Sequence, residues 1–364
     1  MLRCAGGGGV GIALIAGLAL LAFTGQGVAE EYPVGRVAFG VGYNYDAGLS
    51  VVGGFQHRAL MGRDQSIDLS FSLSSEEQTV ALDYRLNGLG NGNPSFGVAV
   101  SHTERDRSAR QGVDTGVTRV SPGAVWDLGD RGVMSLGLVF IEDDLRASVE
   151  APAVLQAEDG TRSLMGVALS GDVAFGAVGL GFNASLLDDG EDLRYTKAEV
   201  ALDYAVPLPP GGLSADIALR LGGIAVAQGQ TTLNDRFLPS SGAIRGFEAY
   251  GFGPVDPAAL DGAPVGATRY AVMSSDMRYA GLLPGAPEVT FGVFIDVGSA
   301  WGLDVDGDAA RAAIDSDRHW RSAAGIIIGR DFGAARLELV LGDALQHRPS
   351  DRVQNVQLNF SSTF

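Results

Sequence analysis

Apolar and polar residues alternate one by one along stretches of about ten residues, and the alternation recurs over most of the chain. In residues 66–74 the sequence SIDLSFSLS places its four apolar side chains on one face and its polar side chains on the other. The same pattern recurs in residues 37–45, 80–85, 134–140 and 217–221. A period of two residues predicts β-strands with one apolar face.

The length of these strands separates a membrane barrel from a soluble sandwich. Strands of soluble proteins are usually about 5–6 residues long, whereas tilted strands of about ten residues cross a bilayer. Although 46% of the 364 residues are hydrophobic, only residues 9–24 form a continuous apolar run, which excludes a polytopic helical membrane protein. Backbone groups in lipid must all be paired, so we predict an all-β fold, an antiparallel transmembrane β-barrel.

The predicted strands number about sixteen, and their connections alternate in length. We expect them to start near residues 36, 49, 65, 78, 95, 113, 132, 163, 178, 193, 213, 267, 288, 321, 335 and 353. Odd-numbered connections include the long segments 147–162, 230–266 and 303–318, whereas even-numbered ones are short and rich in Pro or Gly. Long extracellular loops and short periplasmic turns produce this asymmetry, and an even strand count places both termini in the periplasm.

The first 29 residues have the three parts of a secretory signal peptide. Arg3 gives the positive start, residues 10–23 the apolar stretch, and Gly27-Val28-Ala29 the cleavage site before Glu30. The alternative is a permanent membrane anchor, for which the apolar stretch is short. We therefore predict a leader at 1–29, a barrel at 30–364 and location in a bacterial outer membrane.

Charge and cysteine content limit the partners and the chemistry. The net charge of −17 argues against nucleic acid, because phosphate neutralisation needs clustered Lys and Arg. The single cysteine, Cys4, lies in the predicted leader, so the mature chain has no thiol for a disulfide or a metal site. No G-x-S-x-G, H-E-x-x-H or P-loop motif occurs, and we predict neither enzymatic activity nor a cofactor.

One acidic segment offers a weak metal candidate. Asp304, Asp306, Asp308 and Asp315 have part of the spacing of an oxygen-ligand calcium loop. The sixth position of such a loop should be glycine but is Ala309. A solvated acidic surface loop is the preferred interpretation, and calcium is the alternative.

Three segments resemble the barrel of the BamA/TamA-type outer-membrane protein insertases, the bacterial surface antigen family. Ile244-Arg245-Gly246-Phe247, followed by Gly251-Phe252-Gly253-Pro254, is similar to the family's [VI]-R-G-[FY] loop motif. Residues 294–301, with Asp296 and Gly298, resemble its F-x-D-x-G-x-x-W strand, and residues 360–364 its terminal strand. Residues 42–71 also resemble its first three strands, so the resemblance covers essentially the whole mature chain.

The resemblance implies that the sixth extracellular loop folds back into the lumen. Arg245 would then meet Asp296 and an acidic residue of the twelfth strand, here Asp276. Alternation independently places Asp296 on the face opposite five apolar residues, and puts Asp276 and Arg278 together on one face that we interpret as luminal. Glycine at 246 suits a tight loop tip.

The last strand resembles a C-terminal assembly signal. Its apolar face is formed by Val356, Leu358, Phe360 and Phe364. Only residues 30–35 precede the first strand, so the family's periplasmic polypeptide-transport-associated (POTRA) domains are not expected here. The segment 238–241 also replaces the usual glycine pair before the loop motif.

The family resemblance implies a role in, or accessory to, outer-membrane protein assembly. Its partners would be outer-membrane lipid, unfolded outer-membrane protein clients, and periplasmic or lipoprotein partners. A weak seam between residues 36–46 and 353–364 would template an incoming strand. Two alternatives remain open at this point: a passive pore or structural barrel without insertase activity, and a polypeptide translocator of the two-partner type.

Overall fold

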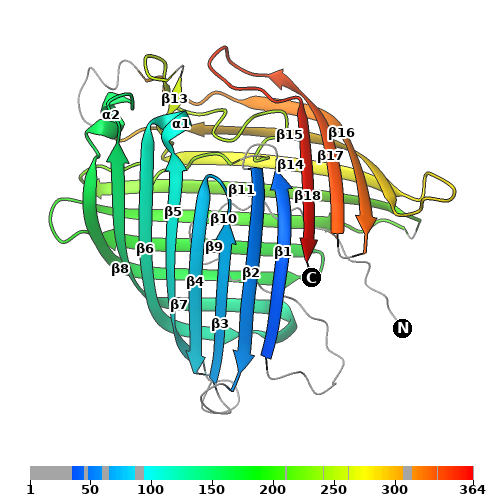
Figure 1. The fold of residues 1–364 in the computed structure, drawn as a ribbon, viewed down its shortest axis with the longest axis horizontal. Coiled ribbons are helices and arrows are strands. Elements are labelled where there is room, and N and C mark those ends of the chain that lie inside the picture. Colours follow the sequence, from blue (N-terminus) through cyan, green and yellow to red (C-terminus); the bar gives the residue numbers. More distant parts are fainter. Residues whose placement is uncertain are drawn as a thin grey trace.

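Sixteen strands form one closed antiparallel barrel (Figure 1). The computed structural model describes residues 35–44, 48–59, 65–86, 94–209, 211–240, 242–260, 262–305, 314–333 and 335–363. The predicted signal peptide lies outside the described residues. The barrel strands are β1 (Gly35–Asn44), β2 (Gly48–Arg58), β3 (Gln65–Leu73), β4 (Glu77–Leu86), β5 (Ser95–Arg107), β6 (Val113–Asp127), β7 (Gly132–Ala147), β8 (Gly160–Phe175), β9 (Val178–Asp188), β10 (Arg194–Val206), β11 (Leu213–Gln228), β14 (Arg269–Ala280), β15 (Val289–Trp301), β16 (Arg321–Phe332), β17 (Ala335–Gln346) and β18 (Val356–Thr363).

The connections hold the few other elements of the described chain. These are α1 (Ser108–Gln111), η1 (Gly129–Arg131), α2 (Ala153–Gln156), β12 (Val255–Asp256) and β13 (Ala263–Pro264). Each barrel strand pairs with its sequence neighbours, and β1 closes the barrel against β18. The predicted all-β class and sixteen-stranded architecture are therefore confirmed.

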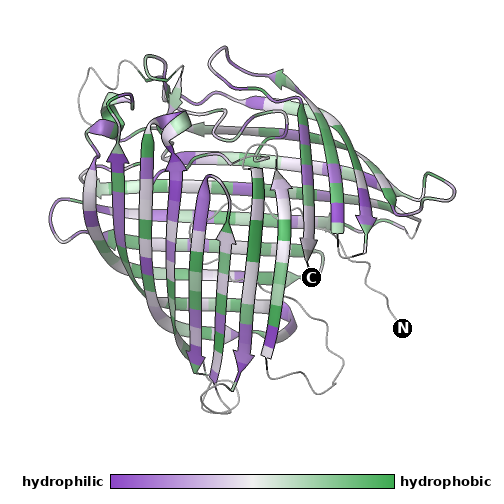
Figure 2. Ribbon diagram, viewed as in Figure 1, coloured by the Kyte–Doolittle hydropathy of each residue, from purple (hydrophilic) through white to green (hydrophobic). Residues whose placement is uncertain are grey.

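Hydrophobic and hydrophilic residues alternate along the strands (Figure 2), and the exposure of their side chains alternates in the same way. In β5, Phe96, Val98 and Val100 are exposed on the outside, whereas Gly97 and Ala99 are less exposed. The outward residues form an apolar surface suited to lipid, as in transmembrane barrels. No helix within the described residues has the length and apolarity of a membrane span.

The strands differ in length around the barrel. On the wall formed by β6, β7 and β8 they have 15, 16 and 16 residues. Next to the closure they are shorter: β1 has 10 residues and β18 has 8. The barrel is thus taller on one side than at the closure, which we call the seam.

The long connections gather at one end of the barrel, which we call the loop end; the other is the turn end. Figure 1 shows α1, α2 and β13 together at the loop end. A separate apolar core joins three of the long connections there through Leu155, Leu233, Val265, Leu303 and Ile314. These connections form a packed cap over the barrel, because their apolar side chains are buried against one another.

Candidate functional site

The sixth loop, residues 229–268 between β11 and β14, packs its apolar side chains against the luminal wall. Ile244, Phe247 and Phe252 are buried in one cluster with wall residues such as Val272 and Ala323. Phe247 and Phe252 contact each other edge to face, with ring centroids 5.7 Å apart. Burial of this apolar area keeps the loop inside the barrel.

Arg245 forms the main polar contact of the loop tip. Its Nε and Nη2 atoms donate to the two carboxylate oxygens of Asp296 at 2.8 and 2.6 Å, and its backbone N–H donates to Oδ2 at 2.8 Å. Nη2 also lies 2.6 Å from Oδ1 of Asp276, an ion pair whose angles fall outside hydrogen-bond geometry. The Asp296 side chain is 0% exposed, so Arg245 provides the charge that a buried carboxylate requires.

The guanidinium also rests on an aromatic ring. Arg245 Cζ lies 4.0 Å from the centroid of Phe294, a favourable cation–π distance. Phe294 in turn covers two wall glycines: a Cβ at Gly325 would lie 2.7 Å from the ring, and one at Gly342 would lie 3.0 Å from it. These glycines leave room for the Phe294 ring, and the ring packs against the Arg245 guanidinium.

Two motif glycines allow the loop tip to approach the wall. Gly246 has φ +92, a backbone conformation that L side chains rarely adopt. A Cβ at Gly298 would lie 2.9 Å from Cδ1 of Ile244 and 2.8 Å from Cγ2 of Val272. Gly298 therefore creates the space that Ile244 occupies.

The structure brings the predicted loop motif and its strand partners into one contact region. Asp276 and Asp296 lie on adjacent strands, β14 and β15, and both face the lumen at Arg245. The apolar face predicted for the last strand is not part of this luminal contact region. Val356 and Leu358 are exposed on the outer surface. Phe360 is half-buried on the same face, and Phe364 lies outside the described residues.

An ion-pair chain that the sequence reasoning missed continues from Asp276 along the wall. Arg278 contacts Asp276 at 3.0 Å and Glu338 of β17 at 2.7 Å. Arg336 contacts Glu338 at 3.2 Å and Asp331 at 3.5 Å. Alternation could have placed these side chains in the lumen, but the pairing depends on the register of β16 and β17.

A second buried ion cluster holds the start of the sixth loop. The Arg236 side chain is 0% exposed; it contacts Glu158 and donates to the carbonyl of Val265 at 2.8 Å. Its neighbour Asp235 accepts from Tyr195 at 2.5 Å and pairs with Arg162 at 2.8 Å. The loop is thus fixed by charges at its base as well as at its tip.

The two described calcium candidates, Asp304 and Asp315, contact different residues. Asp304 accepts hydrogen bonds from the backbone and side chain of Thr231 at 2.8 and 2.6 Å, which ties it to the cap rather than to a solvated loop. Asp315 contacts Arg348 and His319. Asp306 and Asp308 lie outside the described residues. No group of acidic or His residues arranged to hold a metal occurs in the part of the chain that is described.

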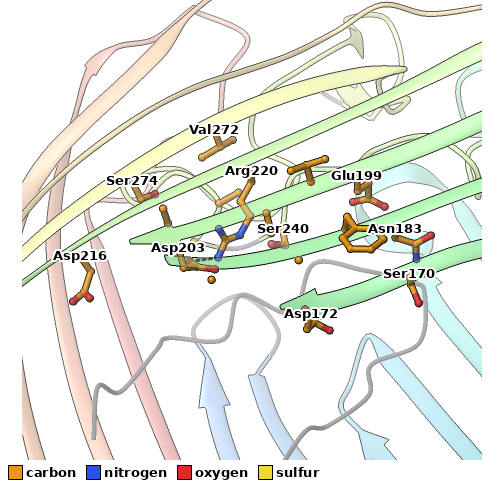
Figure 3. A pocket seen from close by; sticks show the side chains of 18 of the residues that line it. Ser170, Asp172, Asn183, Glu199, Asp203, Asp216, Arg220, Ser240, Val272 and Ser274 are labelled. Carbon is orange, nitrogen blue, oxygen red and sulfur yellow. Dashed lines mark hydrogen bonds and ion pairs between the residues drawn. The ribbon is translucent and has the colours of Figure 1, made fainter. Parts of the chain in front are cut away.

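A cavity of about 1790 Å³ occupies the lumen beside the sixth loop, with lining residues from Pro209 at the turn end to Glu76 at the loop end. Figure 3 shows Asp172, Asp203 and Asp216 on its wall, with Arg220 directed at Asp203. Arg220 Nη2 lies 2.6 Å from Oδ1 of Asp203. Much of the remaining lining is Gly, Ala and Ser, so the cavity is wide and polar enough for water.

The seam has the shortest strand ladder in the described barrel. β1 and β18 share five residue pairs, from Gly40↔Thr363 to Asn44↔Asn359. By contrast, β1 pairs with β2 over ten residues and β17 pairs with β18 over seven. The described pairs between β1 and β18 begin at Gly40 of β1, whereas β1 itself begins at Gly35.

Comparison with known proteins places this geometry in context. The family model described as the Omp85 superfamily domain matches residues 60–364. Among solved structures, BamA from Haemophilus ducreyi lacking POTRA domains 1–3 is 18% identical, with a TM-score of 0.76, over 92% of this chain and 71% of that one. No curated protein matches the chain in sequence.

Two other solved structures share the fold at lower similarity. CdiB from Acinetobacter baumannii is 13% identical with a TM-score of 0.55, over 90% of this chain and 60% of that one. CdiB from Escherichia coli is 13% identical with a TM-score of 0.53, over 93% of this chain and 64% of that one. At these identities the likeness establishes the fold alone.

Proposed function

Because the chain belongs to the Omp85 superfamily, we propose that it acts in, or accessory to, the assembly of β-barrel proteins in the bacterial outer membrane. The role is non-catalytic: the seam receives an edge strand of an unfolded client. The observation that carries the proposal is that residues 35–38 of β1 pair with β2 but with no described residue of β18.

The first strand offers an edge for such a client. Residues 35–38 pair with β2, and no described residue of β18 pairs with them. Edge N–H and C=O groups are a template for adding another strand. Val37 and Phe39 are 57% and 53% exposed on the outer face of β1, where a client strand in lipid would also carry apolar side chains.

Strand length supports the same location. β18 and β3 have 8 and 9 residues, against 16 in β7 and β8 on the opposite wall. A shorter apolar wall is matched by a locally thinner bilayer. Thinning beside the seam would ease the entry of a client strand into lipid. Lipid is therefore a partner, along with the client and the periplasmic or lipoprotein factors that deliver it.

A passive pore and a polypeptide translocator require an open path through the barrel, whereas a structural barrel without insertase activity does not. At the loop end, the cap buries Leu155, Leu233 and Leu303. The sixth loop also packs Phe247 and Phe252 inside the lumen. A packed cap and an occupied lumen favour an activity at the seam. Large steady conductance in planar bilayers would favour the pore or the translocator.

A covalent closure of the seam tests the proposal. Tyr43 of β1 and Phe360 of β18 are paired, so Tyr43→Cys/Phe360→Cys can be oxidised to join the two strands. The background carries Cys4→Ser. We expect the oxidised protein in phosphatidylethanolamine–phosphatidylglycerol vesicles to lose insertion of an unfolded barrel client, and the reduced protein to retain it.

The matched control joins β18 to its other neighbour. Leu339 and Leu358 are paired between β17 and β18, and Leu339→Cys/Leu358→Cys adds the same kind of cross-link without closing the seam. Insertion should survive oxidation of this pair. Equal insertion by the open and cross-linked seam variants would reject a role for seam opening and favour a structural barrel.

A further inference from the structure

Another buried ion pair lies outside the loop motif and holds the residues that lead into β18. Nε and Nη2 of Arg321 donate to the two oxygens of Asp351 at 3.0 and 2.8 Å. The two side chains are only 2% and 1% exposed. Arg321 also donates to the carbonyl of His319 at 2.7 Å, and Asp351 accepts the Arg348 backbone N–H at 2.7 Å.

The tip of the sixth loop pairs with the residues immediately after Asp351. Phe247 and Val353 form an antiparallel bridge. Around it, the Gln354 N–H donates to the carbonyl of Gly246 at 2.9 Å, and the Arg352 N–H donates to that of Gly251 at 2.8 Å. The loop tip therefore acts as a short strand beside the segment that precedes β18.

The contact extends onto β18 itself. Gln357 is the second residue of that strand, and its buried side chain donates to the carbonyl of Phe247 at 3.2 Å. It also contacts the side chain of Gln354 at 3.1 Å. The loop end of β18 is thus held by β17, by the sixth loop and by the Arg321–Asp351 pair.

The turn end of β18 is held by its ladders. Residues 359–363 pair with the second half of β1, and residues 356–362 with β17. The buried hydroxyl of Ser362 makes no hydrogen bond. From Ala38 to Gly35, toward the turn end, the described pairs of β1 are with β2 alone. The two ends of the seam strand therefore differ in how firmly they are fixed.

We propose that Arg321, Asp351 and Gln357 are positioning residues that fix the loop end of β18, so that the seam parts from the turn end. The inference rests on the proposed function for its purpose, but it describes a motion of this chain alone. Breaking a buried ion pair strands a charge in a poorly solvated site, so the pair resists separation far more than a short ladder does. A client approaching from the turn end would meet the edge of residues 35–38 first.

Amide hydrogen exchange of the purified barrel in lipid vesicles, without any client, tests the direction of opening. In the unmodified protein we expect slower exchange at residues 356–358 than at residues 360–363. Asp351→Asn keeps the shape of the side chain but removes its charge; it should speed exchange at 356–358 by roughly a hundredfold. Asp188→Asn, in an exposed loop-end pair with Arg194, is the matched control and should change exchange less than about threefold.

A second variant keeps the test decisive if Asp351→Asn does not fold. Gln357→Leu removes the bond between β18 and the sixth loop while leaving Arg321–Asp351 intact, and it should also speed exchange at 356–358. The inference is overturned if residues 356–358 exchange fastest in the unmodified protein, or if the folded variants leave their rate unchanged. The exchange experiment tests the direction of opening without a client, so its outcome does not depend on the insertion assay that tests the proposed function.

Discussion

The sixth-loop contact and the seam both join segments that lie far apart in sequence, but different interactions hold them. At the loop tip, Arg245 meets two carboxylates, an aromatic ring and an apolar cluster. At the seam, β1 and β18 meet through five backbone pairs. Buried side-chain contacts therefore stabilise the position of the loop tip, whereas backbone pairs between β1 and β18 close the barrel. A stable barrel with one weak edge follows from this division.

Arg245→Ala should produce the largest effect, because it removes the only basic side chain in contact with Asp296 in the described structure. Leaving that buried carboxylate unpaired should cost roughly 3–5 kcal/mol of barrel stability. The measurement is the denaturation midpoint followed by heat-modifiable gel mobility. Arg194→Ala removes an exposed arginine paired with Asp188 and should change the midpoint little.

A double-mutant cycle sharpens this result. Asp296→Ala alone strands Arg245, whereas the double variant strands neither charge, so its loss should be smaller than the sum of the single losses. Strict additivity, or a silent Arg245→Ala, would mean that the loop tip does not hold the barrel. The loop-tip contact would then contribute no more to barrel stability than the seam does.

Arg236→Ala should loosen the contacts between the connections that form the cap. The change removes hydrogen bonds to Glu158 and to the Val265 carbonyl, and charged hydrogen bonds contribute roughly 1.5–3 kcal/mol each. We expect faster proteolysis of the loop end and higher conductance in planar bilayers. Heat-modifiable mobility should persist, because the barrel ladders remain. Unchanged proteolysis would show that the apolar core closes the cap without Arg236.

Gly342→Val tests the support below the loop tip. A Cβ there would lie 3.0 Å from the Phe294 ring and 3.4 Å from the Gly246 nitrogen, so the added side chain must displace the ring or the loop. Overpacking of this kind costs roughly 1–3 kcal/mol. The denaturation midpoint should fall less than in Arg245→Ala. Gly223→Val, at a strand position with open space around it and, like Gly342, without a positive φ, is the control.

The strands were predictable because lipid outside and water inside impose a period of two. All sixteen expected starts fall within about three residues of an observed strand. The largest shifts are informative: Val353 was expected to begin the last strand, but it pairs with Phe247 of the sixth loop, and β18 begins at Val356. Local alternation cannot show that a distant loop will occupy a strand-like segment.

The contact region was predictable only in part. Face parity placed Asp296 and Asp276 on luminal faces, and the family resemblance implied that both meet Arg245. Phe294 shares the luminal parity of Asp296 and so breaks the apolar-out pattern, which was the one available signal of its supporting role. The Arg321–Asp351 pair has no such signal, because it joins a strand to a loop through tertiary packing alone.

The smallest effect should come from replacing Asp315, which forms an ion pair with Arg348 at the loop end of the barrel. The buried Arg321–Asp351 pair lies at the same end. Partial burial would raise the pKa of its carboxyl, but contacts from Arg348, the Asp317 amide and His319 lower that pKa to about 2. A lowered folded-state pKa contributes stability above the ordinary value of 3.8, and that stability is lost as the pH falls toward 2. The carboxylate is 44% exposed, so solvent screens the pair and Asp315→Asn should change stability by roughly 0–1 kcal/mol at neutral pH. Denaturation midpoints at pH 7 and pH 3 should therefore converge slightly in the variant. A loss as large as that of Arg245→Ala would contradict the rule that burial, rather than pairing, separates the strong contacts of this barrel from the weak ones.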